Sequence, residues 1–95
     1  MVCQDFDMAK PEKNKNSVED ELLGRLIRGE RESAKITQVE IAEALGVDQS
    51  LVSRQESGES SLDYFQVYEY LDVLNASFEK FAAKFETELK KLRGE

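Results

Sequence analysis

Histidine is absent from this chain of 95 residues, and cysteine occurs only once, as Cys3. The usual zinc ligand sets of histidine and cysteine are therefore missing, and no internal disulfide can form. Histidine is also the commonest general base, so a nucleophile–base pair has no candidate residues. These absences argue against an enzyme and predict no catalytic residues, no metal and no cofactor, and we interpret Cys3 as incidental.

Long apolar runs and helix-breaking residues are also scarce. No stretch approaches the roughly 20 apolar residues that a membrane span needs, and the first residues are neither basic nor apolar enough for a signal peptide. The single proline, Pro11, precedes the periodic part of the sequence. We therefore expect a cytoplasmic protein without membrane contact, and a mostly helical fold is allowed.

Positive charge is in deficit, because 13 Lys and Arg face 20 Asp and Glu, which gives a net charge of −7. A nucleic-acid-binding protein of this charge has to confine its positive potential to one face or gain it by dimerising. Residues 1–17 contain few apolar groups, which predicts a disordered, flexible arm. This arm is either a solvated tail or a segment that lies along a phosphate backbone through Lys10, Lys13 and Lys15.

The rest of the chain shows helical periodicity, which predicts an all-α fold in one domain. We expect five helices, over residues 18–33, 37–45, 49–56, 62–74 and 78–92. The expected N-caps are Ser17, Thr37, Asp48, Ser61 and Ser77. In the fourth helix, we expect the core to be formed by Leu62, Phe65, Val67, Tyr68, Leu71 and Leu74.

The second and third of these helices are short and are joined by a tight turn. Thr37 and Glu40 form a capping box that begins the second helix, and Gly46 ends it because glycine adopts the left-handed conformation without steric cost. Asp48 precedes the third helix, which runs from Gln49 to Glu56. Two helices joined by a turn of about four residues that contains glycine are typical of a helix-turn-helix.

The third helix is polar on most faces, and Val52 is its only obvious core residue. Glutamine can pair with adenine, arginine with guanine, and serine with either base, in the major groove. Leu51 is ambiguous, because it either touches a thymine methyl group or packs against the first helix. The stretch 49–54 contains no acid, which predicts a positive or neutral face on an acidic body. Four outward side chains suit base edges: Gln49, Ser50, Ser53 and Arg54.

From about residue 22 to 76, the chain resembles the lambda-repressor-like helix-turn-helix superfamily, Cro/XRE type, through Arg31, the run 36–47, the run 49–54 and the run 56–58. The resemblance implies a five-helix fold, with a DNA-binding domain over 18–76 and a C-terminal helix within 77–95. It implies a structural ion pair between Arg31 and Glu56. It implies that Gln38 and Ser57 contact phosphate and that Gln49, Ser50 and Arg54 read bases. We predict that Thr37 and Ser53 also contact DNA.

Two positions depart from the pattern of this family. Gln55 stands where the family often has an apolar residue, so we expect the end of the third helix to be less firmly anchored. Glu59 stands where a basic residue often contacts phosphate. Both departures, together with the overall acidity, bear on the affinity for DNA more than on the fold.

The last predicted helix has an apolar stripe that is richer in phenylalanine than one small domain needs. Either the whole stripe closes the core, or Phe85, Leu89 and Leu92 form a two-fold dimer contact. Dimers of this family read two half-sites one helical turn apart. The second interpretation therefore predicts a homodimer on double-stranded DNA with a palindromic operator.

These observations together predict a sequence-specific DNA-binding transcriptional regulator that acts as a repressor. The acidity and Glu59 favour a different hypothesis, a protein-interaction module with weak or no DNA binding. Such a module would be antitoxin-like and would bind a protein partner such as a toxin. Salt-dependent retention on DNA supports the first hypothesis, and a stable protein partner without DNA retention supports the second.

Overall fold

The computed structural model describes residues 17–94, which form five α-helices and no strand. The helices are α1 (Val18–Ser33), α2 (Gln38–Leu45), α3 (Gln49–Ser57), α4 (Tyr64–Val73) and α5 (Phe78–Leu92). The predicted all-α fold is therefore confirmed. Cys3 and residues 1–16 of the predicted arm lie outside the described residues. Within those residues, no helix combines the length and the apolar character that crossing a membrane requires.

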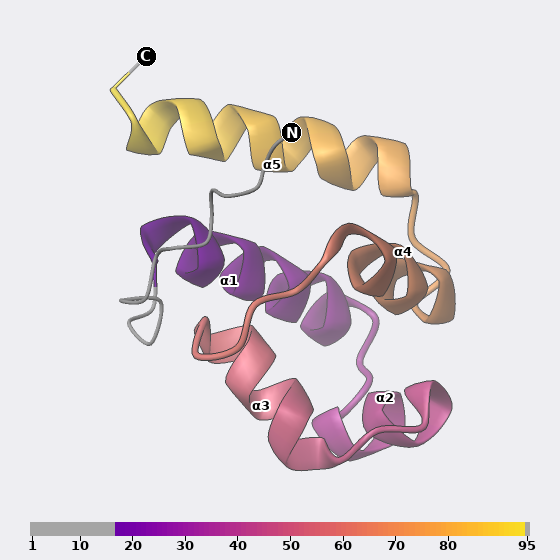
Figure 1. Cartoon of the computed structure of the whole chain (residues 1–95). Helices are drawn as coiled ribbons and strands as arrows, with labels where there is room; N and C mark the ends of the chain where they lie inside the picture. Colours follow the sequence, from indigo (N-terminus) through magenta and orange to yellow (C-terminus); the bar gives the residue numbers. More distant parts are fainter. Residues whose placement is uncertain (1–16, 95) are drawn as a thin grey trace, which may run out of the picture.

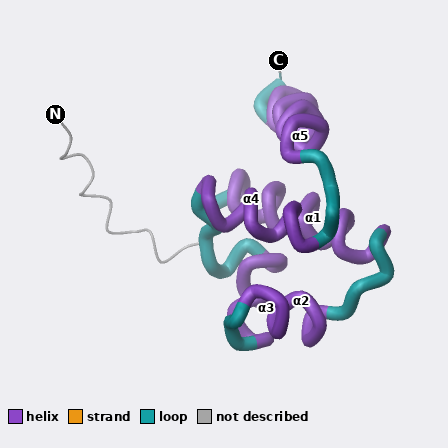
Figure 2. Tube along the Cα trace, turned by 90° about the vertical axis from the view of Figure 1, so that its right-hand side faces the viewer, coloured by secondary structure: helices purple, strands orange, loops and turns teal. Residues whose placement is uncertain are grey.

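Helix α1 occupies the centre of the molecule (Figure 1). It packs against α3, α4 and α5, while α2 packs against α3 and α4. The two views show α5 on one side of α1 and the α2–α3 pair on the other (Figures 1 and 2). Helix α5 makes its contacts with α1 and α4 only, so the α2–α3 pair is left open on the side that faces away from α5.

The first and last helices begin where the sequence predicts them to begin. The Ser17 hydroxyl accepts a hydrogen bond from the Asp20 amide at 2.9 Å, and the Ser77 hydroxyl accepts one from the Lys80 amide at 3.2 Å. These side chains satisfy amides that have no acceptor inside their own helix. Asn75 follows α4 with a φ of 59°, a left-handed conformation that asparagine tolerates.

Helix α4 begins at Tyr64, two residues later than predicted, and its cap is Asp63 instead of Ser61. The Asp63 carboxylate accepts from the Gln66 amide at 2.7 Å, and the Gln66 side chain accepts from the Asp63 amide at 2.9 Å. This reciprocal pair satisfies two amides at once. The Ser61 hydroxyl instead donates to the carboxylate of Asp20 at 3.1 Å.

The core is formed by apolar side chains from all five helices, and the side of α4 that faces it differs from the prediction. Phe65 and Tyr68 were predicted to be in the core, but 64% and 49% of their surfaces are exposed. Tyr70, with 1% exposed, lies in the core instead. The inward stripe of α4 and its end consists of Val67, Tyr70, Leu71 and Leu74.

Helix α3 is held against α1 by backbone contacts at two glycines. A Cβ atom on Gly24 would lie 2.4 Å from the carbonyl oxygen of Gln55, so the two helices touch where a side chain has no room. Gly58 ends α3 with a φ of 89°, and a Cβ atom there would lie 2.7 Å from the Cα of Glu21. Gln55 is 4% exposed. The expectation that the end of α3 is less firmly anchored is therefore wrong.

Candidate nucleic-acid interface

The sequence from Thr37 to Asp48 folds into α2 and the turn that leads to α3. The Thr37 hydroxyl accepts from the Glu40 amide at 3.1 Å, and the Glu40 carboxylate accepts from the Thr37 amide at 2.8 Å, which completes the predicted capping box. Gly46 ends α2 with a φ of 73°. Asp48 precedes α3, but its side chain makes no capping hydrogen bond. The start of α3 is therefore fixed by the turn and not by a side-chain cap.

Helix α3 buries three residues and exposes a polar face. Val52, Gln55 and Glu56 are buried against the body of the domain. Leu51 is half-buried and shares a cavity of about 60 Å³ with Val47 and side chains of α4, which favours packing over base contact for this leucine. The predicted contact residues of this helix are all exposed: Gln49, Ser50, Ser53, Arg54 and Ser57.

A buried ion pair joins α1 to α3. Arg31 donates from Nε to one carboxylate oxygen of Glu56 at 2.6 Å and from Nη2 to the other at 3.0 Å. Arg31 Nη1 also donates to the Ile36 carbonyl at 2.7 Å, before the start of α2. The hydrogen bond with Glu56 raises the pKa of Arg31 above its ordinary value, against the opposing effect of burial. The structure therefore brings Arg31 and Glu56 together as a bidentate ion pair, which fixes the positions of α1, α2 and α3 relative to one another.

Gln38 extends this pair to the exposed start of α3. Its Nε2 donates to Glu56 at 3.0 Å, and its Oε1 accepts from Gln49 Nε2 at 3.3 Å. The side chain of Gln49 is thus oriented by a chain of hydrogen bonds that ends at the buried arginine. The sequence contains no local signal for this arrangement, because Gln38 and Glu56 lie in different helices and meet only after α2 packs on α3.

The two predicted contact residues near the end of α3 differ in how they are bonded. The Ser57 hydroxyl donates to the Arg54 carbonyl at 3.0 Å and accepts from the Glu59 amide at 3.4 Å, so it closes the last turn of the helix. The guanidinium of Arg54 forms no ion pair with another residue of the range 17–94. It is therefore available to a ligand.

A family model described as a helix-turn-helix domain matches residues 22–83 of the chain. The chain belongs to the helix-turn-helix domain family. The structure is similar to the crystal structure of the clp gene regulator ClgR from C. glutamicum, with a TM-score of 0.67 and a sequence identity of 24%. The match covers 79% of this chain and 96% of the ClgR chain. At this identity, the likeness shows a shared fold. No curated protein matches the sequence.

Membership of the family supports a role in DNA binding and transcription regulation, because the second helix of a helix-turn-helix is the one that enters the major groove. In this helix-turn-helix domain that helix is α3, and Thr37 and Gln38 lie at the start of α2 beside it. All seven predicted DNA-contact residues therefore lie on α3 or at the adjacent start of α2.

The predicted dimer residues lie apart from this interface, on α5 at the opposite side of the helix-turn-helix domain (Figure 1). Phe85 is half-buried and packs against the core, and Leu89 is half-buried as well. Leu92 is 46% exposed. No group of histidine, cysteine or carboxylate side chains within residues 17–94 is arranged to hold a metal ion.

Proposed function

We propose that this helix-turn-helix protein is a sequence-specific transcriptional regulator of the Cro/XRE type that represses by binding double-stranded DNA. The observation that carries the proposal is the exposed polar face of α3, on which Gln49 is held by Gln38 and Arg54 has no competing ion pair with residues 17–94. Side chains that are oriented before binding lose little conformational entropy when they meet base edges. The proposed repressor acts in the cytoplasm.

In the proposed complex, α3 enters the major groove and α2 approaches one backbone with its N-terminus. In the first turn of α2, Thr37 caps the Glu40 amide, whereas the amides of Gln38 and Val39 have no acceptor inside the helix, and the helix dipole favours an anion there. Thr37 and Gln38 lie at this end, and we assign both to a phosphate contact. Ser57 and the backbone that follows it lie at the other end of α3, where they approach a second phosphate.

The proposed regulator binds as a homodimer on a palindromic operator. A two-fold axis that relates two subunits presents two α3 helices to half-sites one helical turn apart. We assign the dimer contact to Phe85, Leu89 and Leu92 because the exposed Leu92 continues the apolar stripe of α5 beyond the core. A dimer carries two α3 helices, and binding through both raises its overall affinity for DNA. This gain compensates for the acidity of each subunit.

The test is a selection of random duplex DNA on the purified protein at low salt, followed by binding at physiological salt. Recovery of a two-fold symmetric motif with half-sites one helical turn apart supports the proposal and identifies the operator. Repression is then measured with a reporter gene placed behind that operator. Recovery of no sequence above background would contradict the proposal.

A second candidate function, a protein-interaction module that is antitoxin-like, is favoured by an aromatic surface on α4. This surface consists of Tyr64, Phe65 and Tyr68, which are 78%, 64% and 49% exposed. Phe65 stacks on Tyr68 with ring centroids 6.4 Å apart, and Tyr64 meets Phe78 of α5 edge-on at 5.3 Å. Large exposed aromatic groups mark surfaces that bind other proteins. A toxin co-purified in fixed stoichiometry, with no retention of the complex on DNA, would support this function over the first.

A further inference from the structure

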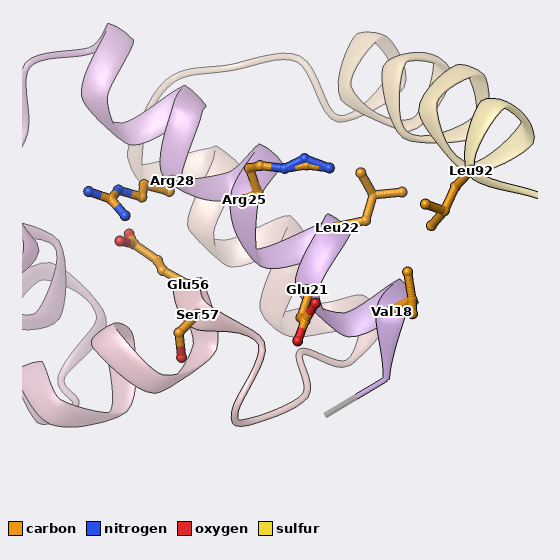
Figure 3. Close-up of a pocket in the computed structure, with 8 residues that line it drawn as sticks. All are labelled: Val18, Glu21, Leu22, Arg25, Arg28, Glu56, Ser57 and Leu92. Atoms are coloured by element: carbon orange, nitrogen blue, oxygen red, sulfur yellow. The ribbon is translucent and has the colours of Figure 1, made fainter. Parts of the chain in front are cut away.

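An open cleft of about 440 Å³ lies between α1, the end of α3 and the end of α5 (Figure 3). Its α1 wall carries Arg25 and Arg28, its α3 wall carries Glu56 and Ser57, and Leu92 closes it on the side of α5. We propose that Arg25 and Arg28 bind phosphodiester groups of the DNA backbone at this cleft and so extend the interface beyond the helix-turn-helix itself. This inference rests on the proposed function, because it requires α3 to lie in the major groove.

The position of the cleft follows from the packing of α1 on α3. Arg25 and Arg28 are exposed and lie one turn apart on the side of α1 that borders the end of α3. Ser57 belongs to both surfaces, since it lines the cleft and also follows Ser50 and Arg54 along the exposed face of α3. Figure 3 shows both arginines and Ser57 around the same opening. A backbone strand that passes the end of α3 therefore meets the α1 arginines.

The charges at the cleft leave these two arginines available to an anion. Glu56 is the acid of the α3 wall, but Arg31 binds both of its oxygens from the buried side. Arg28 contacts Glu32 at 3.0 Å in an exposed pair of the i, i+4 kind, which is weak and which a phosphate can replace. Arg25 forms no ion pair with another residue of the range 17–94. Glu21 is the one acid of the lining without an ion pair in that range.

The shape of the cleft and the type of cation favour the DNA backbone as the ligand. Guanidinium groups bind phosphate oxygens through two parallel hydrogen bonds, which suits a fixed row of phosphates. The cleft is open to solvent, and its arginines lie on an exposed helix face, as contact with a long polyanion requires. Arg25 and Arg28 also place two cations side by side on a chain whose net charge is −7.

The experiment measures the affinity of the full chain for a selected duplex and for a random duplex of equal length across a series of salt concentrations. Each phosphate contact contributes about −0.9 to the slope of log K against log salt. We expect the R25A/R28A variant to reduce the magnitude of that slope by about 1.8. Because phosphates carry no base identity, the variant should weaken binding to both duplexes by the same factor.

The matched control is K80A/K90A, which removes the same amount of charge from exposed positions of α5. We expect this control to keep the slope of the parent, and R25K/R28K to regain most of the slope lost in the alanine variant. Because both arginines are exposed, we expect every variant to fold, and thermal unfolding checks this expectation. An R25A/R28A slope equal to that of the control, while the parent still binds DNA, overturns this inference alone.

Two further outcomes identify different failures. A parent chain that binds no duplex at any salt concentration refutes the proposed function, and this inference with it. A titration with inorganic phosphate tests whether the cleft binds a small phosphate-containing ligand instead of the DNA backbone. Binding of inorganic phosphate by the parent but not by R25A/R28A, with an unchanged DNA slope, overturns the assignment of the cleft to the DNA backbone.

Discussion

At the scale of single residues, Tyr70 combines nearly complete burial with a hydroxyl group that has no hydrogen-bond partner among the described residues. Burial raises the pKa of this phenol well above its ordinary value, and the carboxylate of Glu56 raises it further, while the guanidinium of Arg31 opposes the shift. The side chain is therefore neutral in the folded protein. A buried hydroxyl without a partner costs roughly 1–3 kcal/mol of folding free energy.

The first prediction is that Y70F is more stable than the parent at neutral pH. We expect its free energy of unfolding to rise by about 1 kcal/mol, because phenylalanine has no hydroxyl group to desolvate. The raised pKa also contributes stability that is complete below the unfolded-state pKa of 10.0 and is lost as pH rises toward the folded-state value. Chemical denaturation at pH 8 and pH 11 measures both effects. A Y70F variant that is less stable at pH 8, or that loses as much stability at pH 11 as the parent, contradicts the prediction.

The second prediction separates base reading from backbone contact. R54A should lose about 1–3 kcal/mol of discrimination between operator and random DNA, because Arg54 is exposed and free to bind a base. Q38A should weaken binding to all duplexes, because Gln38 lies at the start of α2 that is assigned to a phosphate, and it should lower discrimination by less than R54A does, because Gln38 also orients Gln49. Titrations of both variants with both duplexes make the comparison. If both variants bind like the parent, the site assignment is wrong.

At the scale of elements, the crossing of α1 and α3 determines the position of α3, the helix that is proposed to enter the major groove. The crossing is close because Gly24 has no side chain between the two backbones. Gly29 lies in the same helix, but a Cβ atom there would have no neighbour within 4 Å. The chain therefore contains a matched pair of glycines in one helix, of which only the first is in contact with α3.

The third prediction compares these two glycines. G24A should lower the free energy of unfolding by about 1–3 kcal/mol, because the new methyl group meets the Gln55 carbonyl and forces the backbones apart. G29A should raise it by up to about 1 kcal/mol, since alanine is the better helix former. Denaturant unfolding measures both variants. Equal stability of G24A and G29A would show that the α1–α3 contact tolerates a side chain.

At the scale of the whole molecule, the described structure has two distinct ends. The α2–α3 pair lies on one side of α1 and α5 lies on the other (Figure 2). The apolar residues assigned to the dimer and the polar face of α3 assigned to base reading are therefore separate surfaces, although Leu92 also borders the cleft beside Arg25 and Arg28. The aromatic surface of α4 is a third surface, next to α5.

The fourth prediction uses this separation. L92E should weaken the proposed dimer by roughly 1–2 kcal/mol, about five- to thirtyfold in its dissociation constant, because it places a charge on an exposed apolar position of α5. F65E, on the aromatic surface, is the control and should leave the dimer intact. Light scattering across a concentration series measures both. Dissociation by F65E and not by L92E would place the contact on α4, and a parent that stays monomeric at high concentration removes the dimer altogether.

Features that depend on neighbours a few residues apart follow from the amino-acid sequence alone. A capping box needs only the residues from Thr37 to Glu40, and the left-handed ends at Gly46 and Asn75 need only those residues. Helical periodicity extends over a few turns. These short-range signals predict the five helices, the tight turn and the polar outer face of α3. The capping pair of Asp63 and Gln66 is an equally local signal, and it predicts the observed start of α4 better than Ser61 does.

The tertiary structure alone decided the features that depend on how the helices pack. Helix α4 has apolar or aromatic residues all around, so its sequence permits several rotations, and packing against α1, α2 and α5 selected the one that buries Tyr70 and exposes Phe65. The bond between Gln38 and Glu56 and the cleft beside Arg25 likewise require α2, α3 and α1 to be assembled. The physical reason is that periodicity shows which residues share a face of a helix, whereas only the complete core determines which neighbour that face meets.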